Sequence, residues 1–268
     1  MKMIFRSILI TFILSISAFA APATLEKSIH EAMADRNGTC VFVDCKSGVV
    51  IASDTAKASD RRTPCSTFKI WNTLIGLECR LVSAPDELFY RWDGETRFLP
   101  AWNKDQTLKE AFQASCVPPF QILAGKIGNE NMQKWIDTIG YGDRDISSGI
   151  EDFWLPREGN KSILISPKEQ ALLIKKLVNG ELPFSGNSRT VLKEVMMINK
   201  TSKGTFYGKT GTGTEIDGSE KENIGWFVGY VTSGNKTYSF ACLVKGMDLS
   251  GKDSRGIIEA VLIKNNLL

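Results

Sequence analysis

Histidine is nearly absent from this chain of 268 residues, which contains only His30. A Ser-His-Asp triad is therefore disfavoured, although one histidine does not strictly exclude it. The chain has six cysteines, too few for a disulfide scaffold, and no Cys-x-x-Cys pair indicates a metal site. We expect most of the cysteines to be small buried hydrophobic residues, and the sequence does not determine whether any pair is bonded.

The chain also lacks an apolar run long enough to span a membrane, and its strongest apolar run lies at the N-terminus. Lys2 and Arg6 precede an apolar run from Ile8 to Leu14, and residues 18–20 read Ala-Phe-Ala. This pattern is typical of a secretory signal peptide cleaved after Ala20, with an uncleaved anchor as the alternative. Because the run is shorter than the roughly 20 residues of a spanning helix, we expect cleavage, no membrane insertion afterwards, and a periplasmic or secreted protein.

The chain also lacks a strong excess of charge. Its formal charge is +3 and falls to +1 when Lys2 and Arg6 are removed with the signal. Such a balance gives no large field to attract nucleic acid or anionic lipid, so a small molecule or a peptide is the expected partner. The oligomeric state is left open, a homodimer included.

No internal repeat or Pro/Ser-rich linker divides residues 21–268, so we expect a single domain of two lobes. "TCVFVDCKSGVVIAS" predicts a hairpin, and "GTFYGKTGT", "IGWFVGYVT" and "KTYSFACLVKG" predict three antiparallel strands. Amphipathic helices are predicted at residues 25–33 and in "SRGIIEAVLIKNN". Residues 66–180 read mainly as helices, including one that begins after Ser166. We therefore predict a mixed α+β fold, with a sheet lobe of about 21–62 and 200–268 and an inserted helical lobe of about 63–199.

One short segment, "TPCSTFK", places Ser66 and Lys69 three residues apart. In a helix beginning near Ser66 the two side chains would share one face, and the helix N-terminus would favour a developing oxyanion. The spacing alone is weak, because Ser233 and Lys236 repeat it where a hairpin turn is expected. A capping serine and a solvated lysine remain the simpler interpretation of the motif alone.

Two further triplets follow in order. Ser115-Cys116-Val117 precedes Pro118-Pro119, which we expect to stop the preceding helix and aim the Ser115 hydroxyl inward. Lys209-Thr210-Gly211 lies in a predicted strand, where a glycine allows another backbone or a ligand to approach closely. Each triplet by itself could be an ordinary loop or strand end, but the ordered set is far more specific.

With these motifs the chain resembles the serine penicillin-recognising enzymes, and most closely the class D β-lactamases. The resemblance covers essentially the whole mature chain and is carried by "CSTFKI", "SCVPPF", "YGDRDISSGIEDFW", "ISPKEQ", "YGKTGTG" and "GWFVGY". It implies a β-lactamase/transpeptidase-like fold with a cleft between the lobes, acylation of Ser66 by a β-lactam, and hydrolysis of the ester. One departure is Asp143, which stands where the family has an asparagine and puts the local hydrogen bonding in question.

The family pattern also implies roles for individual residues. Ser66 and Thr212 would supply the backbone N–H groups of an oxyanion hole, and Ser115 with Lys209 would relay a proton to the departing β-lactam nitrogen. The remaining substrate-binding residues are expected to be Thr210, Gly211, Arg255 and Trp102. Arg255 could instead be an exposed helix residue, and Trp102 could simply pack.

A serine nucleophile needs a base, and only about one lysine in a few thousand is neutral at pH 7 with an ordinary pKa. Either burial lowers the pKa of Lys69 or chemistry changes the group. The resemblance implies the second route, an N6-carboxylysine formed from carbon dioxide or bicarbonate, with no separate cofactor. Trp154 would hold the carbamate, and the apolar residues expected around it are Phe68, Val117, Phe120 and Leu155.

Other functions share these motifs. A β-lactam sensor domain would stay acylated, but such sensors lie behind membrane spans, which this sequence lacks beyond its signal-like segment. A peptidoglycan D,D-peptidase is disfavoured because Trp154 and Val117 match the pattern of enzymes that deacylate. The sequence does not determine whether penicillins, cephalosporins or carbapenems are accepted, which depends on side chains around Trp102 and on loops such as residues 214–223.

Overall fold

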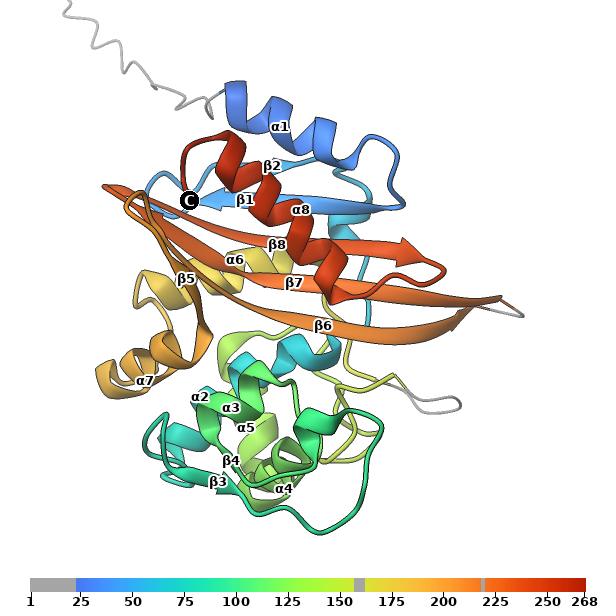
Figure 1. Ribbon diagram of the computed structural model, residues 1–268, viewed down its shortest axis with the longest axis vertical. Helices are drawn as coiled ribbons and strands as arrows, with labels where there is room; N and C mark the ends of the chain where they lie inside the picture. The colour runs from blue at the N-terminus through green and yellow to red at the C-terminus, as the bar shows by residue number, and fades with distance from the viewer. Residues whose placement is uncertain (1–22, 157–161, 218–219) are drawn as a thin grey trace, which may run out of the picture.

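The centre of the molecule is an antiparallel sheet of six strands in the order β2-β1-β8-β7-β6-β5 (Figure 1). The computed structural model describes residues 23–156, 162–217 and 220–268, so the expected signal peptide lies outside the described residues. The strands are β1 (Gly38–Asp44), β2 (Val50–Ala52), β5 (Met197–Lys200), β6 (Thr205–Asp217), β7 (Glu220–Ser233) and β8 (Lys236–Gly246). The sheet therefore joins both ends of the chain, and the predicted mixed fold is confirmed.

The three long C-terminal strands form as their sequence predicts. Strands β7 and β8 are joined across residues 234–235, and Gly234 takes a φ of 58°, which a glycine adopts without strain. One expectation is wrong. Residues 214–223 were expected to form a loop, but β6 and β7 stay paired there, with Thr214 opposite Asn223 and Ile216 opposite Lys221.

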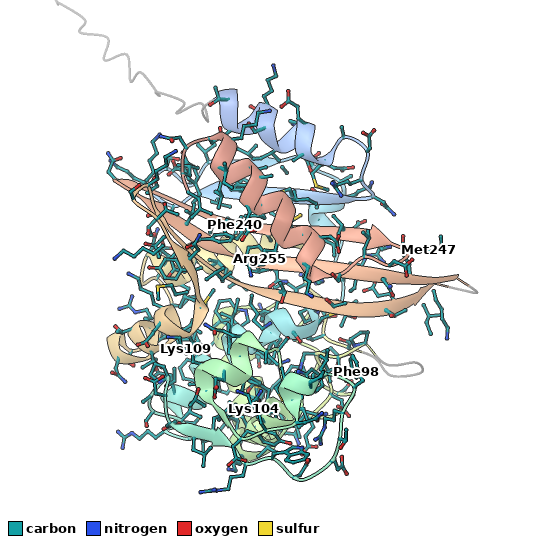
Figure 2. The ribbon with its side chains drawn as sticks, in the orientation of Figure 1. Phe98, Lys104, Lys109, Phe240, Met247 and Arg255 are labelled. Carbon is teal, nitrogen blue, oxygen red and sulfur yellow. The ribbon has the colours of Figure 1, made fainter. Side chains whose placement is uncertain are left out.

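Helices cover both faces of the sheet (Figure 1). On one face lie α1 (Ala23–Met33) and α8 (Gly251–Lys264), and a cluster of buried side chains that includes Ile29, Phe240 and Ile258 fills the space beneath them. Phe240 of β8 lies under α8 in Figure 2. On the other face lies α6 (Pro167–Val178), where Ser239 of β8 donates a hydrogen bond to the Ala171 carbonyl. Thus α6 belongs to the sheet layers, although its sequence lies within the range assigned to the helical lobe.

The short turn η1 (Lys57–Ser59) packs against β1 and α6. The remaining elements form the helical part of the molecule below the sheet. They are η2 (Cys65–Phe68), α2 (Lys69–Glu78), β3 (Leu88–Tyr90), η3 (Pro100–Trp102), β4 (Gln106–Thr107), α3 (Leu108–Gln113), α4 (Pro118–Ile127), α5 (Asn129–Ile139) and α7 (Gly186–Met196). Nine of the ten residues of α2 are buried. This central helix carries Lys69 at its first position and connects the site to the core.

Short or exposed elements were not predicted from the sequence. Strand β5 pairs with β6 as the edge of the sheet, but its four residues are exposed or half-buried and show no alternation. The pair β3 and β4 forms a separate small sheet of three and two residues. Patterns this short lack the periodicity on which a sequence prediction depends.

The cysteines behave largely as expected. Five of the six are buried, and Cys79 is half-buried. Among the residues that the structure describes, no helix has the length and apolar character needed to cross a bilayer.

Candidate active site

Ser66 and Lys69 lie together at the start of α2. Lys69 Nζ donates a hydrogen bond of 2.9 Å to Ser66 Oγ. The local geometry differs from the prediction, because Ser66 lies in the 3-10 turn η2 and the α-helix begins only at Lys69. In a 3-10 turn residues i and i+3 are eclipsed, so this turn brings the two side chains into contact. Ser66 is 8% exposed and Lys69 is fully buried, so the pair reaches solvent only through Ser66.

Strand β6 holds η2 in place through two glycines on one face. A Cβ atom added to Gly211 would lie 3.0 Å from the Pro64 carbonyl oxygen, and one added to Gly213 would lie 2.7 Å from Cys65 Sγ. The backbone of β6 therefore approaches η2 more closely than any side chain would allow. This confirms the close approach predicted at Gly211. The approaching group in this structure is the turn that carries Ser66.

Ser115 lies in the tight connection between α3 and α4. It has a φ of 56°, an unusual conformation for a residue with a side chain, and its N–H donates to the Phe112 carbonyl. Pro118 and Pro119 were expected to stop the preceding helix, α3. They instead occupy the first positions of α4, where a missing N–H costs nothing. The expectation about the prolines was therefore wrong, while Ser115 does point toward the site.

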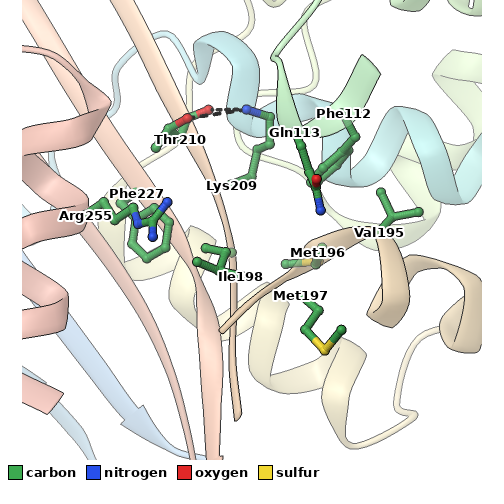
Figure 3. A pocket seen from close by; sticks show the side chains of 11 residues that line it. Phe112, Gln113, Val195, Met196, Met197, Ile198, Lys209, Thr210, Phe227 and Arg255 are labelled. Carbon is green, nitrogen blue, oxygen red and sulfur yellow. Dashed lines mark hydrogen bonds between the residues drawn. The ribbon is translucent and has the colours of Figure 1, made fainter. Parts of the chain in front are cut away.

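Lys209 of β6 joins Ser115 across the two lobes. Its Nζ donates to Ser115 Oγ at 2.9 Å. Figure 3 shows its contacts with Thr210, whose carbonyl lies 3.0 Å and whose Oγ1 lies 3.4 Å from the same nitrogen. The ammonium group also lies 5.6 Å from the centre of the Phe112 ring. Two of the predicted motifs, 94 residues apart in the chain, are thus in direct contact.

Both lysines are in surroundings that disfavour their charged forms. Burial lowers the pKa of Lys69 to about 7, a shift that the nearby Cys116 and Cys65 thiols partly oppose. Burial, and then the charge of Lys69, lower the pKa of Lys209 well below its usual range. Neither lysine contacts a carboxylate among the ion pairs of the described residues. Burial therefore favours the neutral form of both amines, and the amine of Lys69 can exchange a proton near neutral pH.

Aromatic side chains enclose the base of the site. Lys69 Nζ lies 5.3 Å from the centre of the Phe120 ring, and the Phe68 ring stacks on Trp154 at 5.7 Å. Trp154 is fully buried, and its indole N–H has no hydrogen-bond partner. An indole N–H usually finds an acceptor when buried, so this one is suited to an acceptor that binds here. Val117 and Leu155 are half-buried, Leu155 being packed against the core.

The predicted carboxylate-binding residues line one cavity. Lys209, Thr210 and Arg255 contribute to a cavity of about 240 Å³ between β6, α8 and the end of α7 (Figure 3). Arg255 Nε donates to Glu259 one helical turn away, at 2.9 Å, and the arginine side chain is 40% exposed. Its other guanidinium nitrogens can therefore face a ligand.

The two other predicted residues lie at the margins. Thr212 is exposed on β6, and its hydroxyl accepts a hydrogen bond from Gly251 N at 2.9 Å, which ties β6 to the start of α8. Trp102 is half-buried, and its indole nitrogen donates to the Ala114 carbonyl at 3.0 Å. Trp102 thus packs beside the unusual turn at Ser115, while Phe98 covers its other side with ring centres 5.9 Å apart.

The residues that offered an alternative base or an alternative Ser-x-x-Lys pair lie far from this site. His30 is exposed on α1, which packs on the opposite face of the sheet from α6. Ser233 and Lys236 flank the β7–β8 turn, and Ser233 Oγ donates to the Lys203 carbonyl. Of the two Ser-x-x-Lys pairs, only the buried pair Ser66 and Lys69 lies beside the Ser-Cys-Val and Lys-Thr-Gly motifs.

Comparison with known proteins decides between families that share this geometry. The penicillin-binding protein transpeptidase domain matches residues 38–264. The probable β-lactamase YbxI of Bacillus subtilis (strain 168) is 36% identical over 241 residues, which cover 90% of this chain and 85% of that protein. This chain belongs to the class D β-lactamases.

Solved structures agree with this assignment. The class D β-lactamase FUS-1 (OXA-85) of Fusobacterium nucleatum subsp. polymorphum has a TM-score of 0.82 at 33% identity, over 92% of this chain and all of that one. The C-terminal domain of the Bacillus licheniformis BlaR penicillin-receptor also matches, with a TM-score of 0.80 at 26% identity over 91% of this chain and 95% of that domain. The class D fold is therefore shared with a receptor.

Asp143, which stands where the family has an asparagine, still accepts hydrogen bonds from backbone N–H groups. Asp143 Oδ1 accepts from the Leu164 N–H at 3.0 Å and from the Asp145 N–H at 3.3 Å. An amide oxygen could accept in the same way. The preceding Gly142 has a φ of 52° and would place a Cβ atom 2.0 Å from the Leu164 carbonyl oxygen, so this turn requires glycine.

Several residues of the site were not found from the sequence. Phe112, Gln113 and residues 195–198 line the same cavity as Lys209. The segment that contains α7 and β5 carries no motif, and tertiary contacts bring it there: β5 pairs with β6, and α7 packs against α2 and α3. The Gln170 side chain donates to Thr67 Oγ1 at 3.1 Å, which links α6 to η2. This contact spans 103 residues, and no local pattern could indicate it.

Proposed function

We propose that this class D β-lactamase hydrolyses the amide bond of penicillin-type β-lactams through an acyl-enzyme on Ser66. One observation carries the proposal: a fully buried lysine, with a pKa lowered by burial to about 7, donates a hydrogen bond of 2.9 Å to a serine hydroxyl. A general base must lie within hydrogen-bond reach of the proton that it removes, and Lys69 meets that requirement for Ser66. The exposed His30 does not.

We further propose that Lys69 works as an N6-carboxylysine. An amine reacts with carbon dioxide only when it is neutral, and burial lowers the pKa of Lys69 to about 7, which favours the neutral form far more than in water. The unpartnered indole N–H of buried Trp154, beside Phe68 in the same aromatic cluster, supports the presence of an additional acceptor. The carboxyl group would supply negative charge and proton-accepting oxygens at Lys69.

The chain's own residues would then divide the work. Lys69 removes the Ser66 proton as the hydroxyl attacks the β-lactam carbonyl, and the N–H groups of Ser66 and Thr212 bind the developing oxyanion. Lys209 and Ser115, in contact at 2.9 Å, carry a proton to the β-lactam nitrogen as its bond to the carbonyl breaks. The same base at Lys69 activates the water that hydrolyses the ester, which returns the Ser66 hydroxyl.

The substrate carboxylate would bind at the β6 end of the cavity. Thr210 and Arg255 line it, and Arg255 keeps donors beyond the Nε that Glu259 occupies. A guanidinium group binds a carboxylate through two parallel hydrogen bonds. Gly211 leaves the β6 backbone free of a side chain on the face toward Ser66.

Turnover in the presence of bicarbonate tests this function. The purified chain is mixed with a chromogenic cephalosporin, with and without bicarbonate, and the covalent adduct is followed by intact mass. We expect repeated turnover that rises with bicarbonate and an adduct on Ser66 that disappears when substrate is exhausted. An adduct in stoichiometric amount that persists for hours would contradict hydrolysis and favour a receptor, which the similarity to the BlaR domain makes the second candidate.

The biological setting follows from the proposed reaction. We propose export by the predicted signal peptide of residues 1–20 and a role in β-lactam resistance, since an exported hydrolase meets the antibiotic before its targets. We expect a susceptible bacterium that expresses the full chain to grow at raised penicillin concentrations. Unchanged susceptibility of cells that export active enzyme would contradict the resistance role.

A further inference from the structure

A pair of cysteines far from the active site lies across two strands of the sheet. Cys40 of β1 and Cys242 of β8 are direct partners in the antiparallel register, and both are fully buried. Both belong to the buried cluster between the sheet and the helices α1 and α8. They are close to the two ends of the described chain, with roughly 200 residues between them.

The hydrogen-bond pattern places the pair at a position that suits a disulfide. The Cys40 N–H donates to Ser53 Oγ and the Cys40 carbonyl accepts from Ser53 N, both at 3.0 Å, so both backbone groups face away from β8. Along an antiparallel pair, hydrogen-bonded and non-hydrogen-bonded pairs of residues alternate. Cys45 N donates to the Thr237 carbonyl, so Cys45 belongs to a hydrogen-bonded pair of β1 and β8. Cys40 lies five positions away, an odd number, and therefore belongs to a pair of the other kind. Cys40 and Cys242 are therefore a pair without mutual hydrogen bonds, in which the Cα atoms approach to about 4.5 Å.

That spacing falls within the range of disulfides, whose Cα atoms lie about 4.4–6.8 Å apart. The side chains of such pairs also point to the same face of the sheet. Two positions along, Phe42 and Phe240 occupy the equivalent pair, and their rings are 5.6 Å apart. Phe240 lies under α8 in Figure 2, so the two thiols share a dry, covered space.

We propose that Cys40 and Cys242 form a cross-strand disulfide that links β1 to β8. One thiolate attacks a disulfide RSSR, such as oxidised glutathione or an exchange protein where the chain folds, and releases RSH. The second thiolate attacks the mixed disulfide and releases another RSH. Both cysteine thiols are oxidised, RSSR is reduced, and the two cysteine protons are carried by the released thiols.

The order of events follows from burial. Burial, and then the neighbouring Cys242 thiol, raise the pKa of Cys40 well above its ordinary value. A protonated thiol in a closed core does not attack disulfides, so the bond must form before α1 and α8 cover the sheet. Once formed, it is shielded from reductants. Its function is to join the N-terminal strand to the C-terminal strand, independently of the reaction at Ser66.

Refolding followed by peptide mapping tests the proposal. The reduced chain is unfolded, refolded in a mixture of reduced and oxidised glutathione, and unfolded again with iodoacetamide present. We expect two of the six cysteines to escape alkylation and one linked peptide pair, containing Cys40 and Cys242. Alkylation of all six, or links spread over other pairs, would overturn the proposal.

Matched variants separate this link from a general effect of oxidation. Cys40→Ala and Cys242→Ala should each abolish the linked peptide, whereas Cys79→Ala, at the half-buried cysteine, should retain it. The oxidised wild-type chain should unfold on the order of 10 °C above the chain refolded in reductant, because the bond closes a long loop. The double variant Cys40→Ala/Cys242→Ala should show no such difference. Equal transitions for oxidised and reduced wild type would contradict a stabilising link.

Discussion

At the scale of single residues, the account depends on how burial changes two amines. Lys69 and Lys209 end in amines that water would normally keep charged, yet the fold buries both side chains. The sequence identifies both lysines, because Lys69 belongs to the Ser-x-x-Lys motif and Lys209 to the Lys-Thr-Gly motif. It could not show their burial, since the aromatic neighbours Phe112, Phe120 and Trp154 come from other segments.

Lys69→Ala should lower kcat for β-lactam hydrolysis by about 10²–10⁴-fold, the usual contribution of a positioned base. Deacylation should be affected most, so the Ser66 adduct should accumulate in intact-mass spectra. Lys236→Ala is the matched control, because it removes the lysine of the other Ser-x-x-Lys pair on an exposed turn. Unchanged turnover in Lys69→Ala would contradict the assignment of the base.

The lowered pKa of Lys69 also predicts how stability depends on pH. The folded chain releases this proton near pH 7 and the unfolded chain only near pH 10.4, so the unfolded state binds more protons between those values. The free energy of unfolding should therefore rise through that window, by up to about 1.4 kcal/mol per pH unit from this group.

Lys69→Met lacks the titrating amine and keeps a side chain of similar length. Urea unfolding in buffer free of carbon dioxide should show the variant more stable than wild type at pH 7, with the difference shrinking by pH 9. A difference that stays constant over this range would show that the buried amine does not titrate there. Titrations of groups that do not interact with Lys69 are common to both proteins and cancel in the comparison.

At the scale of elements, strands and helices with strong periodicity were predictable and the connections between them were not. The hairpin of β7 and β8 follows from apolar, β-rich runs on either side of a turn, and the helix α8 follows from amphipathicity over 14 residues. The 3-10 turn η2, the start of α4 at Pro118 and the edge strand β5 depend on tertiary contacts. Those same irregular segments carry Ser66 and Ser115 and line the cavity.

Gly211→Ala tests how closely β6 must approach η2. The new methyl group would lie 3.0 Å from the Pro64 carbonyl oxygen and 3.3 Å from Cys65 Cβ, and would push the turn that carries Ser66. A displacement of about 1 Å at a reacting group can cost about 10²-fold in rate, so kcat/KM should fall by that order.

The matched control is Gly186→Ala in α7, where an added Cβ meets no atom within 4 Å. It should retain full activity and gain slightly in melting temperature, because alanine restricts the unfolded chain more than glycine does. Equal activity of both variants would show that η2 tolerates displacement by β6.

At the scale of the whole molecule, the sheet separates two buried clusters with different tasks. The cluster under α1 and α8 contains Ile29, Phe240 and Ile258, and the other contains Phe68, Trp154 and the rest of the helical part. The lobes predicted from the sequence describe this arrangement only in part, because α6 lies against the sheet. A helix with a clear start signal does not reveal which layer it will join.

Ile258→Ala should therefore separate stability from activity. Ile258 of α8 is fully buried, and truncating such a side chain costs about 2–5 kcal/mol of unfolding free energy. Well below the new melting temperature, kcat should match wild type, because the residue lies in the cluster on the other side of the sheet. A large loss of kcat in the folded variant would contradict this separation.

The central claim is that Lys69 carries a carboxyl group, and the most direct measurement is carbon-13 NMR of the chain equilibrated with ¹³C-labelled bicarbonate. The account predicts one carbamate carbon signal in the wild-type protein. The signal should be absent in Lys69→Ala, retained in the control Lys236→Ala, and weakened as the pH falls below 7, where the amine is protonated. A wild-type spectrum without the signal at pH 8, or one that keeps it in Lys69→Ala, would contradict the account.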